Sequence, residues 1–119
     1  SIEEFIRLVL EKLPLNAILI DDCSSYYQII FLQKHEGLRP DIDLKLIRPL
    51  GINNWGKSQN QIVSELKETQ RNVFLIASTG PCGELINKLK QEDGHIEKFS
   101  LCPDKYIFKL VTQKQIEPD

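Results

Sequence analysis

Hydrophobic positions along this chain follow two spacings, and each is typical of one kind of element. Apolar residues three or four positions apart predict helices, and short unbroken apolar runs predict buried strands. The first helix is expected over Ile2 to Lys12, behind a capping box of Ser1 and Glu4. Helical spacing returns over residues 25–36, after Ser58, and around Leu85 to Leu89.

Strands are expected at residues 16–20, 42–47 and 73–77, and a hairpin at 95–101 and 105–111 around a Cys102-Pro103-Asp104 turn. Strand and helix alternate before the hairpin without a repeat or a dividing linker. This order predicts a single α/β domain over residues 1–119. The expected architecture is a three-layer α/β/α, Rossmann-like sandwich, mostly parallel, with strand order 2-1-3 and the hairpin beyond strand 3.

The second helix has specific expected boundaries and an expected apolar face. Ser24 or Ser25 can cap its N-terminus, and Gly37 supplies its stop. Tyr27, Ile30 and Phe31 are expected to form one apolar face of this helix.

The predicted strand order brings two polar loops together, because the carboxyl ends of parallel strands meet at one edge of a sheet. These loops and the long irregular connection at 49–57 supply the candidate ligand-binding residues. From the first loop they are Asp21, Asp22, Cys23 and Ser24; from the second, Ser78, Thr79, Gly80 and Gly83; from the connection, Trp55.

Composition narrows the class of protein. With 41% hydrophobic and 27% charged residues the chain is typical of a globular domain, and its net charge of -2 gives no footprint for nucleic acid. No apolar run is long enough to span a bilayer. The absence of Met indicates a processed product or a piece of a longer protein.

Three cysteines lack any Cys-x-x-Cys spacing, so neither a structural zinc site nor any other metal or cofactor is expected. Cys23 and Cys82 would lie at neighbouring strand ends, where a helix N-terminus can lower a thiol pKa. A buried structural cysteine and a disulfide between the two remain the alternatives.

Two chemical interpretations of the loops stay open beside structural ones. Asp21 and Asp22 resemble the acidic pair of a phosphoreceiver domain, but no phosphoacceptor Asp ends a later strand, and acids also cap helices. The small residues of 78–83 could hold an anion on backbone amides, or could simply shape a turn. Trp55 could stack on a sugar or a partner, or could cover the sheet.

One segment resembles a known family. Leu-Pro at 13–14, Asn-Ala-Ile-Leu at 16–19, Phe-Leu-Gln at 31–33 and Glu-Gly-Leu-Arg-Pro-Asp at 36–41 are similar to a segment of bacterial multi-pass membrane proteins of the dolichyl-phosphate-mannose-protein mannosyltransferase-like glycosyltransferase group. A weaker match continues through Trp55 and residues 71–75, so the resemblance covers about half of the chain. The family's loop reads Gly-Asp-Asn-Asp, whereas Asp22-Cys23-Ser24-Ser25 stands here.

The resemblance implies a non-catalytic, soluble accessory domain on the extracytoplasmic side of a parent in the cell membrane. Its partners would be the parent membrane domain and a glycan or protein acceptor, and it would hold no catalytic residue. Two other classes remain open. One is a small-ligand or phosphate-binding α/β enzyme domain that uses the two loops, which would be cytoplasmic without the resemblance. The other is an interaction module that dimerises through a patch around Trp55.

Overall fold

The computed structural model describes residues 1–22, 25–48 and 56–112. Within these ranges the chain forms four helices and five strands. The helices are α1 (Ile2–Lys12), α2 (Tyr26–His35), α3 (Gln59–Glu68) and α4 (Gly80–Gln91). The strands are β1 (Ile18–Asp21), β2 (Asp43–Leu46), β3 (Val73–Leu75), β4 (His95–Cys102) and β5 (Lys105–Val111).

The strands form one mixed sheet in the order β2-β1-β3-β5-β4. β1 pairs in parallel with β2 and with β3, and the β4–β5 hairpin joins β3 through antiparallel β5. The predicted order 2-1-3 with a hairpin beyond strand 3 is therefore confirmed. A mixed α/β fold follows from this arrangement.

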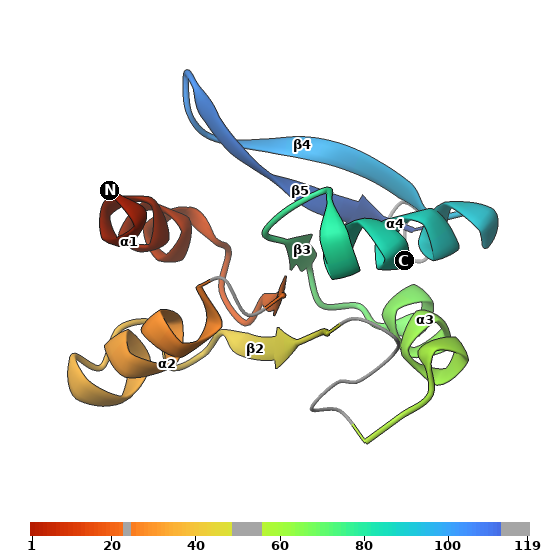
Figure 1. Ribbon diagram of the computed structural model, residues 1–119, viewed down its shortest axis with the longest axis horizontal. Coiled ribbons are helices and arrows are strands. Elements are labelled where there is room, and N and C mark those ends of the chain that lie inside the picture. Colours follow the sequence, from red (N-terminus) through yellow and green to blue (C-terminus); the bar gives the residue numbers. More distant parts are fainter. Residues whose placement is uncertain (23–24, 49–55, 113–119) are drawn as a thin grey trace.

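The helices lie in two pairs about the strands (Figure 1). α1 and α2 are at the left of the view and α3 and α4 at the right. An ion pair between Arg7 and Glu36 joins the first pair, and Lys88 Nζ donates to Asn60 Oδ1 across the second at 3.2 Å. No helix of the described ranges is long and apolar enough to cross a membrane.

Local sequence signals explain where most helices begin. Ser1 and Glu4 form the predicted capping box of α1, whose bounds match the prediction. Ser58 forms a second capping box with Gln61 at α3. Each box satisfies backbone amides that a helix N-terminus otherwise leaves without partners.

The apolar face predicted for α2, formed by Tyr27, Ile30 and Phe31, is not the face that the helix buries. Ile29 and Leu32 point into the core, whereas the Tyr27 and Phe31 residues are 61% and 54% exposed. α2 is apolar around most of its circumference, so periodicity alone did not identify its inner face. The helix consequently presents two aromatic rings to solvent.

Arg39 holds the segment between α1 and β1 in place. Its guanidinium donates to the carbonyl oxygens of Leu10 at 2.6 Å, Leu13 at 2.7 Å and Pro14 at 3.0 Å. It also donates to both carboxylate oxygens of Asp41, at 3.0 and 2.8 Å.

Asp41 extends this clamp to the start of β1 by accepting the Asn16 amide at 2.8 Å. Hydrogen bonds from Arg39 and from that amide hold the pKa of the Asp41 carboxyl well below its usual range. The clamp of Arg39 and Asp41 thus fixes the end of α1 against the strand that leads to the predicted site.

Candidate functional site

The carboxyl ends of β1 and β3 lie side by side, as the sequence predicted. Ile20 pairs with Leu75, and the Ile76 amide donates to the Ile20 carbonyl at 3.0 Å. The Sγ of Cys82, from the start of α4, lies 3.8 Å from the same carbonyl oxygen. The loop after β1 and the first turn of α4 therefore share one edge of the sheet.

Asp21 is the most deeply buried polar residue of this edge, with no exposed surface. Its carboxylate accepts the Asp22 amide at 2.7 Å and the Ser25 hydroxyl. Burial raises the pKa of the Asp21 carboxyl, and these two hydrogen bonds partly offset the rise.

Ser25 occupies the predicted N-cap position of α2, but its side chain makes no capping hydrogen bond. Its hydroxyl is turned to Asp21 instead. Both side chains thus bind each other inside the domain, and this hydrogen bond joins the end of β1 to the residue that precedes α2.

Asp22 is the acidic group that faces the neighbouring loop. Its Oδ2 lies 3.7 Å from the position that a Cβ on Gly80 would take. Gly80 has a φ of +59° and is the first residue of α4, whose cap residue Thr79 forms no side-chain capping bond. A carboxylate near a helix N-terminus is electrostatically favoured, and it disfavours a phosphate at that position.

The segment Ser78 to Gly83 is not the open loop that the sequence suggested, because α4 begins at Gly80. Gly80 adopts the positive φ at the start of α4, whereas Gly83 allows close packing. A Cβ on Gly83 would come within 2.6 Å of the Ser78 carbonyl oxygen, so this position needs glycine for close packing. Ser78 and Thr79 are exposed beside it.

Cys82 is a buried free thiol. Burial, followed by the nearby charge of Asp22, raises the pKa of Cys82 to about 12. A thiol with this pKa stays protonated near neutral pH and is a poor nucleophile there. The interpretation of Cys82 as a structural residue is therefore the one the geometry favours, and no disulfide forms at Cys82.

Three of the predicted site residues, Cys23, Ser24 and Trp55, lie outside the described residues. Within the described ranges no cluster of three His, Cys, Asp or Glu side chains could hold a metal ion.

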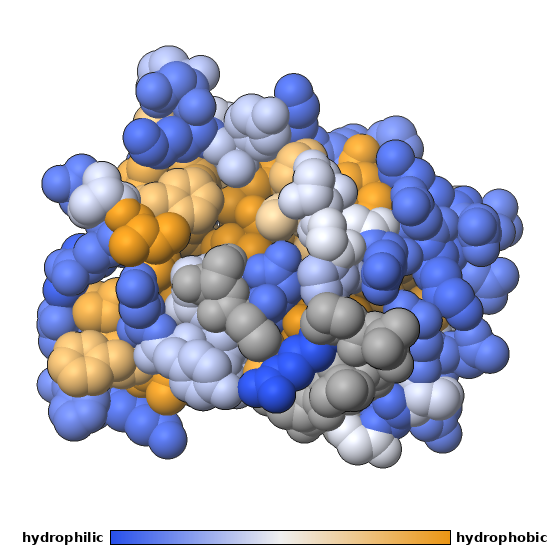
Figure 2. All heavy atoms as spheres, in the orientation of Figure 1, coloured by the Kyte–Doolittle hydropathy of each residue, from blue (hydrophilic) through white to orange (hydrophobic). Residues whose placement is uncertain are grey.

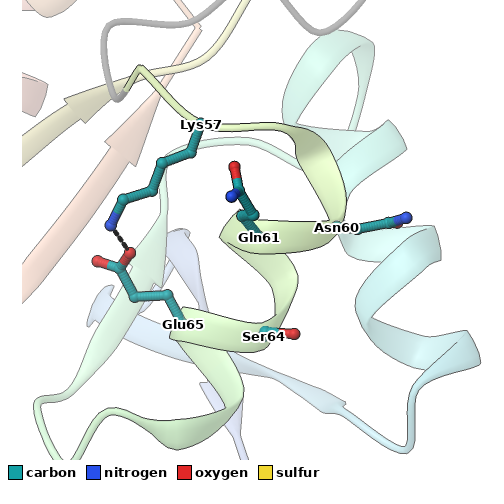
Figure 3. Close-up of a pocket in the computed structure, with 5 residues that line it drawn as sticks. All are labelled: Lys57, Asn60, Gln61, Ser64 and Glu65. Carbon is teal, nitrogen blue, oxygen red and sulfur yellow. Dashed lines mark hydrogen bonds and ion pairs between the residues drawn. The ribbon is translucent and has the colours of Figure 1, made fainter.

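Sequence reasoning missed two hollows on the helices, which are among several in the part of the chain that the structure describes. One, of about 370 Å³, lies along α3 and is lined by Lys57, Asn60, Gln61, Ser64 and Glu65 (Figure 3). Lys57 forms an ion pair with Glu65, and Asn60 points away from that pair towards α4. The sequence pattern that could have indicated this hollow is a series of polar residues four positions apart. The same pattern is typical of a solvated helix face.

The other is a groove of about 530 Å³ between α1 and α2, here called the α1–α2 groove. Its lining combines apolar and charged side chains: Ile2, Glu3, Arg7, Tyr27, Gln28, Phe31, Leu32 and Glu36. Figure 2 shows hydrophobic residues at the surface over these helices, with hydrophilic residues among them. Sequence reasoning missed this groove because it recognised Tyr27 and Phe31 only as part of an apolar helix face.

No family model, curated protein or solved structure matches this chain.

Proposed function

We propose that the chain is a non-catalytic accessory domain of a glycosyltransferase-like membrane protein, and that it acts on the extracytoplasmic side. Its partners are the membrane portion of the parent protein and a glycan or protein acceptor. In this proposal the paired helices cover both faces of the sheet, as in a three-layer, Rossmann-like α/β/α sandwich. The family assignment rests on the resemblance of residues 13–41.

The non-catalytic part of the proposal rests on the burial of Asp21 and Cys82 and on their internal contacts. Both are buried at the edge where an open α/β sheet usually places its catalytic groups. Asp21 accepts two internal hydrogen bonds, and Cys82 is protonated near neutral pH because burial raises its pKa to about 12. Neither side chain is available for acid–base or nucleophilic work on a substrate.

The Arg39 and Asp41 clamp supports the proposal because it gives the resemblance a structural reason. Arg39 and Asp41 belong to its specific part, around Leu32 to Asp41, and they join α1 to β1 by hydrogen bonds. A shared sequence at these positions therefore has a structural reason, since it specifies how the helix and strand meet. This reason requires no catalytic role for the segment.

The coding sequence that precedes Ser1 tests the proposal. Several hydrophobic spans of about 20 residues each are expected upstream, because that length crosses the hydrocarbon core of a bilayer. A gene without such spans would refute the membrane assignment.

A second candidate, a small-ligand-binding α/β domain, is favoured by one observation. Asp22 and Gly80 lie together at the β1 and β3 ends, with Thr79 exposed beside them. The Asp22 carboxylate favours a hydroxylated or cationic ligand over a phosphate there. Unchanged binding of such a ligand in Asp22→Ala and Thr79→Ala variants would remove this candidate.

A further inference from the structure

We propose that the α1–α2 groove is a carbohydrate-binding site that takes a neutral disaccharide or a longer neutral glycan. A pyranose ring presents an apolar C–H face and a rim of hydroxyl groups. A site for it needs exposed aromatic faces beside several polar side chains. The groove offers both, at a place remote from the strand ends.

The aromatic part consists of Tyr27 and Phe31 on α2. These residues are 61% and 54% exposed, whereas many other apolar side chains of the domain are buried in its core. Because they are four residues apart on one helix, they lie about 6 Å apart along its axis, which is close to the length of one pyranose unit. Two neighbouring sugar rings can therefore each meet one aromatic ring.

Both aromatic rings are already held in place. Arg48 Nη2 donates to the Tyr27 hydroxyl at 2.9 Å. The Phe31 ring stacks on the His35 imidazole, with centroids 4.4 Å apart and an interplanar angle of 27°. Rings that are fixed before binding lose little conformational entropy when a ligand arrives.

The polar part of the groove comes from α1 and from both ends of α2. Arg7 Nε donates to Glu3 at 3.0 Å, and Arg7 Nη2 donates to both oxygens of Glu36, at 3.1 and 2.8 Å. These bonds position two carboxylates that can each accept further hydrogen bonds, and Gln28 adds an amide that donates and accepts. Sugar hydroxyls need this combination of donors and acceptors.

The charge of the groove selects among other occupants. Two carboxylates, Glu3 and Glu36, stand beside the guanidinium of Arg7 in the lining, and the Arg48 guanidinium on the Tyr27 hydroxyl brings the charge close to balance. A groove without an excess of cations does not favour an anionic membrane surface or a nucleic acid. A wholly apolar ligand would remove these charged groups from water without replacing their hydration.

This inference rests on the proposed accessory role, for which it names the ligand class. The 119-residue chain is titrated with cellobiose and with α-linked mannobiose, and binding is followed by saturation transfer to the sugar signals. At least one disaccharide is expected to bind saturably, and Tyr27→Ala and Phe31→Ala are each expected to weaken it about tenfold. Tyr106→Ala, at a 44% exposed aromatic residue of β5, serves as the control and should leave the affinity unchanged.

Circular dichroism and thermal unfolding establish that each variant is folded, which the exposure of both residues favours. No saturable binding of either disaccharide would overturn the inference, as would an equal loss in the Tyr106→Ala control. Binding to anionic vesicles, or dimerisation through α2, without sugar binding would overturn it too. If neither disaccharide binds but hydrophobic spans precede Ser1, the sugar-binding inference fails and the accessory role stands. If a disaccharide binds but no such spans precede Ser1, the accessory role is refuted and the sugar-binding site stands.

Discussion

Replacing Arg39 by Ala should destabilise the domain more than the replacement of any fully exposed cation. The guanidinium donates to three carbonyl oxygens, those of Leu10, Leu13 and Pro14, and to Asp41. At roughly 1 kcal/mol for each hydrogen bond to a carbonyl, the three carbonyl bonds together contribute about 3 kcal/mol. The Arg39 side chain is 23% exposed, so water replaces part of these bonds and the expected loss is about 2–3 kcal/mol.

A loss of this size lowers the melting temperature of a domain of this length by about 10 °C. Urea and thermal unfolding, followed by circular dichroism, measure both quantities. Arg39 has a φ of 44°, and Ala keeps the Cβ, so backbone strain is the same in both proteins and cancels from the comparison. Arg39→Lys should lose at least half as much stability, since an ammonium cannot reproduce the planar fork.

Arg7→Ala is the matched control. Its guanidinium also makes several hydrogen bonds, but only to the exposed carboxylates of Glu3 and Glu36. Exposed ion pairs contribute little, so the melting temperature should change much less than in Arg39→Ala. Equal effects of the two substitutions, or an Arg39→Lys variant as stable as the wild type, would refute the clamp.

Three further predictions concern the β1 and β3 ends. Burial raises the pKa of Asp21, so the folded state binds its proton more tightly than the unfolded state does. The stability that this residue contributes is therefore lost as pH rises from the ordinary Asp pKa through the folded pKa. The Asp21→Asn substitution should flatten the pH dependence of the urea unfolding midpoint over this range. Iodoacetamide at neutral pH should modify the partly exposed Cys102 and spare the buried Cys82, as read by mass spectrometry, and fast labelling of Cys82 in the folded chain would contradict its raised pKa of about 12. Gly83→Ala should cost about 1–3 kcal/mol in unfolding free energy, because its Cβ would approach the Ser78 carbonyl oxygen, and an unchanged midpoint would show that the contact is absent.

Much of the fold was accessible from the sequence, because local signals and the global arrangement agree. Ser1 and Glu4 indicated the start of α1, Pro14 indicated its end, and Ser58 indicated the start of α3. The alternation of strands and helices gave the parallel order 2-1-3, since right-handed crossovers leave few alternatives. Short-range chemistry was sufficient for these features.

The inner face of α2 was not accessible. Ile29 and Leu32 on one side compete with Tyr27 and Phe31 on the other, and only tertiary packing decides which pair is buried. The Arg39 clamp was missed for a different reason. Its acceptors are backbone carbonyls more than 20 residues away in sequence, which leave no pattern in the side chains.

The juxtaposition of the β1 and β3 ends could be predicted from the sequence, but the burial of the side chains there could not. Parallel pairing correctly brought Asp22 and Gly80 to one edge. Burial then changed what the other groups there can do, because Asp21 turned inward to Ser25 and Cys82 entered the core. Burial is a property of the assembled domain, so spacing along the chain does not reveal it.

The most direct measurement is a map of backbone amide chemical shifts during titration of the isotope-labelled chain with the disaccharide that binds best. We expect the shifts to concentrate on residues of α1 and α2, around Arg7, Tyr27 and Phe31, while the amides of Asp22 and Gly80 stay unchanged. Shifts concentrated at Asp22 and Gly80 would contradict the account, because they would place ligand binding at the strand ends to which it assigns a structural role.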